Sequence, residues 1–247
     1  MGNLDRAVKL LDMANRQGID CLTFSAVLDF CVDLYEKGII NKQDTGGMEL
    51  DRRFETTSRL LDMTARGEGF GQVLGSGWLG AIQRLGRGVE KHAYHIKGTE
   101  PDFDARVSFG VEALGAVTNP RGAHDMPVGG LTVARGRSPD FFKKVMARRG
   151  LSEKDAERVF VPPGFDLGRL LAHYENWATV LNCLGICFRM QSSRLYDLPI
   201  CADIYSAATG IARRPEELLK AAERAYNIYR AANVREGFSR KDDSFPQ

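Results

Sequence analysis

The chain has 247 residues, of which 43% are hydrophobic and 27% charged, which is ordinary for one large or two small globular domains. Its net charge of +2 gives no reason to expect nucleic-acid binding, and no apolar run is long enough to span a membrane. Five cysteines without short-loop spacing argue against a secreted disulfide scaffold and favour the cytoplasm. The first six residues predict a helix start rather than a signal peptide.

Apolar residues recur at helical spacing through the first part of the chain. They predict helices at 4–17, 24–35 and 52–66. Cys31 lies on the apolar stripe of the second of these, so we expect it to be a buried core residue. Residues 70–85 predict a fourth helix. Its four glycines, which either weaken the helix or let another helix approach closely, are Gly71, Gly75, Gly77 and Gly80.

The second part of the chain begins with a stretch rich in glycine and proline. We expect a connector, a short helix near 107–116 and a long irregular loop at 118–138. Further helices are predicted at 139–149, 152–160, 166–184 and 199–210, followed by a long one that opens at Pro215. The tail from residue 240 is predicted to be extended. No segment shows the alternation typical of a strand, so the predicted fold class is all-α.

Two six-residue segments repeat each other, residues 15–20 (the first hexad) and 182–187 (the second hexad). Each reads Asn-x-x-Gly-Ile followed by Asp or Cys, and each closes an apolar helical run. The glycine fits the left-handed position that ends a helix. Polar side chains and unpaired peptide groups then lie beside the helix end. Two such ends, facing each other, would clamp a polar ligand from both sides.

The hexads resemble the two pterin-binding motifs of the aldehyde ferredoxin oxidoreductase family, which hold tungsten, less often molybdenum, between two pterin dithiolenes. The family pattern is Asp-x-x-Gly-Leu followed by Asp or Cys. In both hexads this chain has Asn in place of the first Asp and Ile in place of Leu. Further segments resemble the family in the same order along the chain, at 34–38, 95–106, 118–124 and 233–243. The resemblance implies an all-α, multihelical fold with two helical subdomains, 1–100 and 101–247, each carrying one hexad.

The resemblance also implies roles for residues of the hexads. Asn15, Asp20, Asn182 and Ile186 would bind the pterin, whose ring N–H groups suit carboxylate and amide acceptors. Cys187 would be one thiolate ligand of a 4Fe-4S cluster, which needs four. Considered without the resemblance, Cys187 also fits a partly buried thiol, and the asparagines also fit helix C-caps.

His124 follows Gly-Ala in the long loop. Imidazole titrates near neutrality and suits proton transfer at a metal centre. The resemblance implies that His124 lies beside the metal and is catalytic, although a lone loop histidine is otherwise commonly just exposed.

The implied function is that of the C-terminal part of a tungstopterin or molybdopterin oxidoreductase. It would oxidise a small aldehyde to a carboxylic acid and pass electrons through the 4Fe-4S cluster to a ferredoxin-type acceptor. The family's Cys-x-x-Cys-x-x-x-Cys run lies upstream of the first hexad. We therefore expect the chain to need an N-terminal half, as a separate chain or a missing segment. Whether it forms a homo-oligomer stays open.

A second interpretation keeps the fold without the chemistry. The chain would then be a non-catalytic helical subunit that binds a partner or assists assembly. Asparagine at both motif acids favours this alternative, and the retained Asp20, His124 and Cys187 oppose it.

Overall fold

The computed structural model describes residues 3–101, 111–123, 138–161, 164–187, 190 and 195–245. These residues form helices and no strand, apart from an isolated antiparallel bridge between Ile96 and Thr99, so the all-α prediction is confirmed. Among the described helices, none combines the length and apolar character that a membrane crossing requires. Contacts between Cα atoms divide the chain into two units, Met1–Glu100 with Phe245–Gln247, and Pro101–Ser244.

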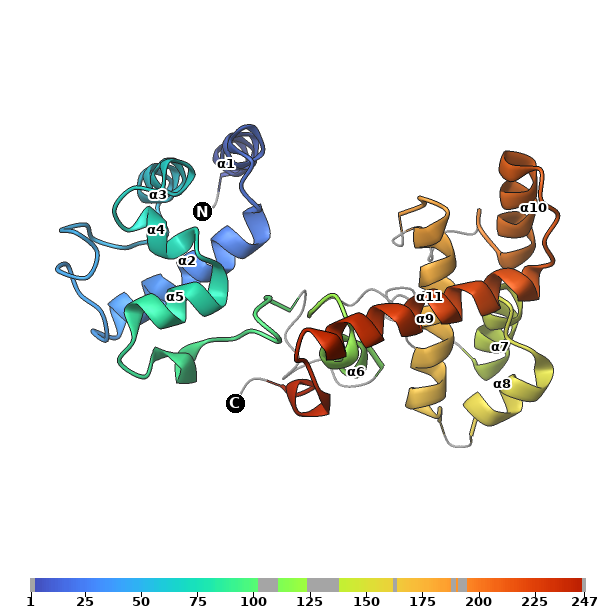
Figure 1. The fold of residues 1–247 in the computed structure, drawn as a ribbon. Helices are drawn as coiled ribbons and strands as arrows, with labels where there is room; N and C mark the ends of the chain where they lie inside the picture. Colours follow the sequence, from blue (N-terminus) through green and yellow to red (C-terminus); the bar gives the residue numbers. More distant parts are fainter. Residues whose placement is uncertain are drawn as a thin grey trace. The chain divides into compact units, whose positions relative to one another are not determined.

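The first unit follows the predicted helices closely. Its helices are α1 (Leu4–Gln17), α2 (Cys21–Glu36), α3 (Phe54–Arg66), α4 (Gly71–Leu74) and α5 (Gly77–Leu85), with a 3₁₀ turn at Val89–His92. In Figure 1, α1 and α3 lie side by side, and α2 runs beside α5. The single helix predicted at 70–85 is wrong, because the chain makes two shorter helices there.

The core of the first unit is built around α2. Val27, Cys31 and Leu34 are fully buried on this helix and pack with Leu60 of α3 and Trp78 of α5. Burying a large apolar side chain contributes roughly 1.5–3 kcal/mol, so packing rather than intrinsic propensity stabilises these helices. The predicted burial of Cys31 is confirmed.

Gly71 explains part of the glycine-rich stretch. A Cβ atom at this position would lie 2.3 Å from the carbonyl carbon of Met63, a separation that real Cβ atoms do not show. The start of α4 therefore contacts the end of α3 at backbone distance. The glycines were expected either to weaken a helix or to let another helix approach closely. At Gly71 the second expectation is confirmed.

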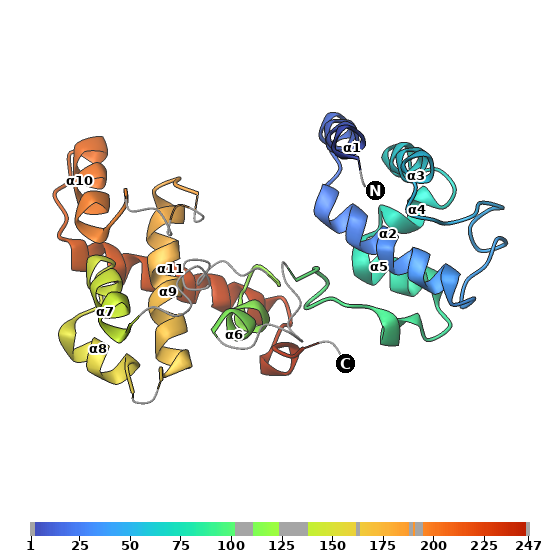
Figure 2. The ribbon, with the colours of Figure 1, turned by 180° about the vertical axis from the view of Figure 1, so that it is seen from behind.

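The second unit is also helical, as Figure 2 shows from behind. Its helices are α6 (Val111–Thr118), α7 (Pro139–Arg148), α8 (Glu153–Val159), α9 (Leu167–Cys183), α10 (Leu198–Thr209) and α11 (Pro215–Arg235). They agree with the predicted positions, although the start expected near 107 lies outside the described residues. The helices α9 and α11 cross in both views and pack against each other.

The tail differs from its prediction. Residues Arg240–Asp242 form a 3₁₀ turn instead of an extended segment. The backbone N–H and the hydroxyl of Ser239 both donate to Asp242 Oδ2, at 2.6 and 3.0 Å. This local capping interaction stabilises the turn.

Helix α9 runs through the core of the second unit. Within the described residues, Leu170 and Tyr174 pack in a cluster with Met146, while Trp177 and Leu181 pack in another with Leu198. All six side chains are buried. Because both halves of α9 are anchored, its C-terminal end, which carries the second hexad, has a well-determined position within this unit.

Candidate functional site

The first hexad forms the junction between α1 and α2. Gly18 has a left-handed backbone, with φ of 68°, and its N–H donates to the Asn15 carbonyl at 3.3 Å. The N–H of Ile19 donates to the Ala14 carbonyl at 2.9 Å. These two bonds are the Schellman arrangement, in which a left-handed glycine ends a helix.

The second hexad ends α9 in the same way. Gly185 has φ of 73°, and its N–H donates to the Asn182 carbonyl at 3.0 Å. The N–H of Ile186 donates to the Leu181 carbonyl at 2.9 Å. The asparagine therefore occupies the same place relative to the glycine in both hexads, and the predicted glycine turns are confirmed.

The side chains of the hexads divide into an inner and an outer set. Ile186 is half-buried and packs against the cluster that contains Trp177 and Leu181, which anchors the turn. Asn15 and Asn182 are exposed, as expected of residues available to a ligand. One hexad lies in each unit, and the prediction that the two face each other across a ligand stays a prediction.

Asp20 also caps a helix, a role that was not predicted from the sequence. It is the N-cap of α2, where Oδ1 accepts the backbone N–H groups of Leu22 at 2.9 Å and Thr23 at 2.8 Å. An aspartate directly before an apolar helical run is the sequence signal for this role. Both contacts use Oδ1, and within the described residues Oδ2 makes no hydrogen bond, so it remains available as an acceptor.

The five thiols differ sharply in accessibility. Cys183 and Cys187 are exposed, whereas Cys31 and Cys201 are buried. Burial raises the pKa of the Cys31 thiol to about 12 and that of Cys201 to about 11. In the described part of the chain, no three His, Cys, Asp or Glu side chains gather closely enough to hold a metal ion. Cys187 is thus an accessible thiol without further ligands beside it there.

His124 lies outside the described residues, but the segment that leads to it is held by α11. The Thr118 carbonyl accepts a hydrogen bond from Arg230 Nη1, and the Pro120 carbonyl accepts one from Asn233 Nδ2 at 2.6 Å. Asp243, whose side chain is 3% exposed, accepts from Arg230 Nη2 at 3.4 Å. Asn233 and Asp243 belong to the C-terminal segment on which the family resemblance partly rested, and their contacts here are structural.

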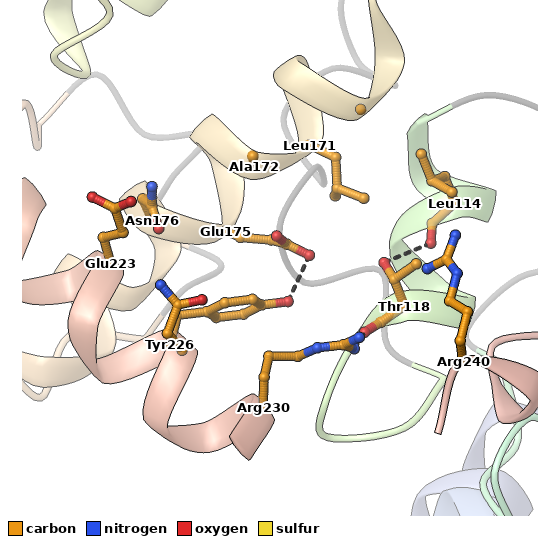
Figure 3. Close-up of a pocket in the computed structure, with 12 residues that line it drawn as sticks. Leu114, Thr118, Leu171, Ala172, Glu175, Asn176, Glu223, Tyr226, Arg230 and Arg240 are labelled. Atoms are coloured by element: carbon orange, nitrogen blue, oxygen red, sulfur yellow. Dashed lines mark hydrogen bonds between the residues drawn. The ribbon is translucent and has the colours of Figure 1, made fainter. Parts of the chain in front are cut away.

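A groove of about 400 Å³ lies between α6, α9 and α11 (Figure 3). Within it, the Tyr226 hydroxyl donates to Glu175 Oε1 at 2.5 Å. Burial raises the pKa of Glu175 above its ordinary value, against the opposing effects of the Tyr226 hydrogen bond and the Arg230 charge. Burial, and secondly the Glu175 charge, raise the pKa of Tyr226 as well. The pair therefore favours its protonated form.

A smaller cavity of about 50 Å³ brings the predicted site residues of this unit together. Asn182 of the second hexad lines it together with residues 119–121, the segment that precedes His124. Glu175 and Tyr226 line it as well, so the pair borders both the cavity and the groove.

Sequence reasoning overlooked Glu175, although a signal for it exists. It lies four residues after Leu171 and three before Ala178, both of which are buried, so it falls on the apolar stripe of α9. A carboxylate on such a stripe must find a partner, because burying an unpaired charge is costly. The identity of that partner, Tyr226, is set by the packing of α9 against α11.

Comparisons with known proteins agree with the resemblance. A family model described as "Aldehyde ferredoxin oxidoreductase, domains 2 & 3" matches residues 1–247. A tungsten-containing aldehyde ferredoxin oxidoreductase of Pyrococcus abyssi (strain GE5 / Orsay) is 25% identical over 254 residues, covering 100% of this chain and 38% of the relative. The WOR-like subunit of an aliphatic sulfonate oxidoreductase of Pyrococcus furiosus is 29% identical over 125 residues, covering 45% of this chain and 20% of the relative.

A solved structure shares the fold. It is the active site complex BamBC of benzoyl coenzyme A reductase in complex with 1,5-dienoyl-CoA. The alignment has a TM-score of 0.74 and 23% identity, and it covers 99% of this chain and 40% of that one. The chain thus spans about 40% of the length of the larger proteins that it matches throughout.

Proposed function

Because the chain belongs to the aldehyde ferredoxin oxidoreductase family, we propose that it is the C-terminal part of an enzyme that oxidises an aldehyde to a carboxylic acid. The reaction consumes water and releases two protons and two electrons. A ferredoxin-type acceptor takes the electrons singly. The observation that carries this proposal is the shared backbone of the two hexads, each of which leaves polar side chains exposed beside a helix end.

The described residues fit a pterin ligand. A pterin ring offers N–H donors. In the first unit, Asp20 Oδ2 and the exposed amide of Asn15 are acceptors for such donors, and in the second unit the exposed amide of Asn182 is one. When bound, a tungsten or molybdenum bis-pterin supplies the redox chemistry. In this proposal the chain's own residues orient that group, and Ile186 anchors the second turn through the core.

Cys187 is proposed as a cluster ligand and His124 as the proton-transfer residue. The exposed thiol of Cys187 follows directly after the second glycine turn, so a thiolate there would be accessible at the end of α9. A 4Fe-4S cluster needs four thiolates, and we infer that the other three come from the region that the longer relatives carry beyond this match. His124 would move a proton near the metal.

Anaerobic purification of the active enzyme that contains this chain tests the proposal. We expect tungsten or molybdenum, four irons and aldehyde-dependent reduction of ferredoxin. Cys187→Ser should remove the cluster absorbance and the electron transfer, because a hydroxyl replaces one of four thiolates. Metal analysis and visible spectroscopy measure both effects.

Cys183→Ser is the matched control, since Cys183 is an exposed thiol four residues earlier. The control should keep cluster and activity. Cluster loss in Cys183→Ser with an unchanged Cys187→Ser would contradict the ligand assignment. An enzyme with neither pterin metal nor cluster would favour the alternative, a helical assembly or partner-binding subunit.

A further inference from the structure

The pair of Glu175 and Tyr226 forms a wall shared by the groove and the smaller cavity. The groove is wide, at about 400 Å³, and includes exposed side chains such as Glu223 and Arg240. The cavity, at about 50 Å³, has room for a water molecule and is lined by Asn182 and residues 119–121. Groups that border both spaces can exchange protons with each.

The contact inside the pair suits proton transfer. The distance from the Tyr226 oxygen to Glu175 Oε1 is 2.5 Å, which is at the short end for an O–H···O bond and within direct transfer range. Both side chains are partly buried, and burial disfavours the charged form of each. The pair therefore keeps a proton under conditions where an exposed glutamate would be ionised.

Charged groups around the pair come from several elements. From α11, Arg230 and the exposed Glu223 face the groove, and Arg240 of the tail lines it as well. Asp243 faces Arg230, and Arg121 lines the cavity. Arg230 is bound to the Thr118 carbonyl and to Asp243, so it moderates the field at Glu175 without forming an ion pair with it.

We propose that Glu175 and Tyr226 relay protons between the small cavity beside the second hexad and the larger groove. This inference rests on the proposed function, whose reaction releases two protons for each aldehyde. Glu175, which is protonated at rest, first gives its proton to water in the groove. The Tyr226 oxygen then takes a proton from the cavity while its hydroxyl proton moves to Glu175 Oε1, so each cycle transfers one proton and returns the pair to its protonated form.

Isosteric variants of the active enzyme test the relay. Glu175→Gln and Tyr226→Phe each remove a transferable proton and keep the side-chain shape. We expect kcat to fall roughly 10²-fold, at the low end for groups that transfer protons, with a larger solvent deuterium isotope effect and unchanged KM and metal content. Glu223→Gln makes the same chemical change at an exposed position of the groove and should keep the wild-type rate.

Infrared spectroscopy of the full chain gives a readout that does not depend on activity. The wild type should show a carboxylic-acid band that persists above pH 4.5, shifts in D₂O and is absent from Glu175→Gln. Retention of the unfolding midpoint in Glu175→Gln would show that the fold is intact. A carboxyl band that is missing or fails to exchange would contradict the relay.

The activity measurements separate the two proposals. If the wild-type enzyme is active and both variants show the wild-type kcat and solvent isotope effect, the relay alone is overturned. A wild-type enzyme that contains its cofactors and does not oxidise aldehydes would overturn the proposed function, and the relay with it.

Discussion

At the scale of single residues, His173 is a buried imidazole on α9. It is 8% exposed, and its Nε2 has no hydrogen-bond partner within the described residues. Burial lowers the pKa of His173 to about 4, with a further contribution from the nearby Arg149 charge and an opposing one from Asp155. The folded protein therefore holds this side chain neutral at pH values where an exposed histidine gains a proton.

His173 should make the protein sensitive to mild acid. As the pH falls from 6.5 to about 4, the unfolded chain binds a proton at this residue and the folded chain does not. The contribution of His173 to the free energy of unfolding is therefore fully present above pH 6.5. It decreases through this window by about 3 kcal/mol in total. Urea unfolding at pH 7 and pH 4 should show a smaller decrease for His173→Gln than for the wild type.

A matched variant, His92→Gln, removes an exposed imidazole and should keep the wild-type pH dependence. Equal decreases for His173→Gln and the wild type would show that His173 does not couple protonation to folding.

At the scale of secondary-structure elements, the two helix ends at the hexads follow one local rule. Both glycines are left-handed, and both accept a substituent without steric contact, because no atom lies within 4 Å of a Cβ built there. Glycine is therefore required at Gly18 and Gly185 because of the left-handed backbone conformation, and not because a side chain would collide with neighbouring atoms.

Alanine at either hexad glycine should destabilise the protein by similar amounts. Gly18→Ala and Gly185→Ala each force a side chain into left-handed backbone, at about 1–2 kcal/mol. Gly168→Ala is the control, because that residue lies within α9 and its Cβ would make ordinary contact with Asp166 Oδ1 at 3.6 Å. It should stabilise the protein by about 0.5–1 kcal/mol. Chemical unfolding measures all three, and neutral hexad variants would contradict the shared geometry.

At the scale of the whole molecule, contacts between distant segments position the chain that leads to His124. Asn233 and Pro120 are 113 residues apart in sequence, and Arg230 and Thr118 are 112 apart. These contacts tie the end of α6 to α11 within the second unit. They place residues 119–121 beside Asn182 at the small cavity.

Removal of the Asn233 amide should weaken the second unit. Asn233→Ala leaves the carbonyl of the buried Pro120 without this donor, which costs about 1–3 kcal/mol. Asn227→Ala, at an exposed position on the same helix, should change stability by less than about 0.5 kcal/mol. Urea unfolding compares the two, and equal effects would indicate that the Pro120 contact contributes nothing specific.

Local sequence patterns predicted much of this structure. The helix at 4–17, the glycine turns of both hexads and the burial of Cys31 follow from interactions within a few residues, or from apolar spacing that leaves one face to be buried. The N-cap at Asp20 was readable in the same way and was overlooked. The break between α4 and α5 was not predicted, although the glycines of this stretch were recognised as residues that could weaken a helix, because the apolar spacing continues across it.

The pairing of Glu175 with Tyr226 and of Arg230 with Thr118 required the folded structure. Each joins residues from different helices, 51 and 112 positions apart, and no local spacing encodes such a partner. A periodic pattern specifies which face of a helix is buried, because burial acts on the face as a whole. Which polar groups meet across that face depends on how the helices cross, and the crossing of α9 and α11 arises from the packing of the complete second unit.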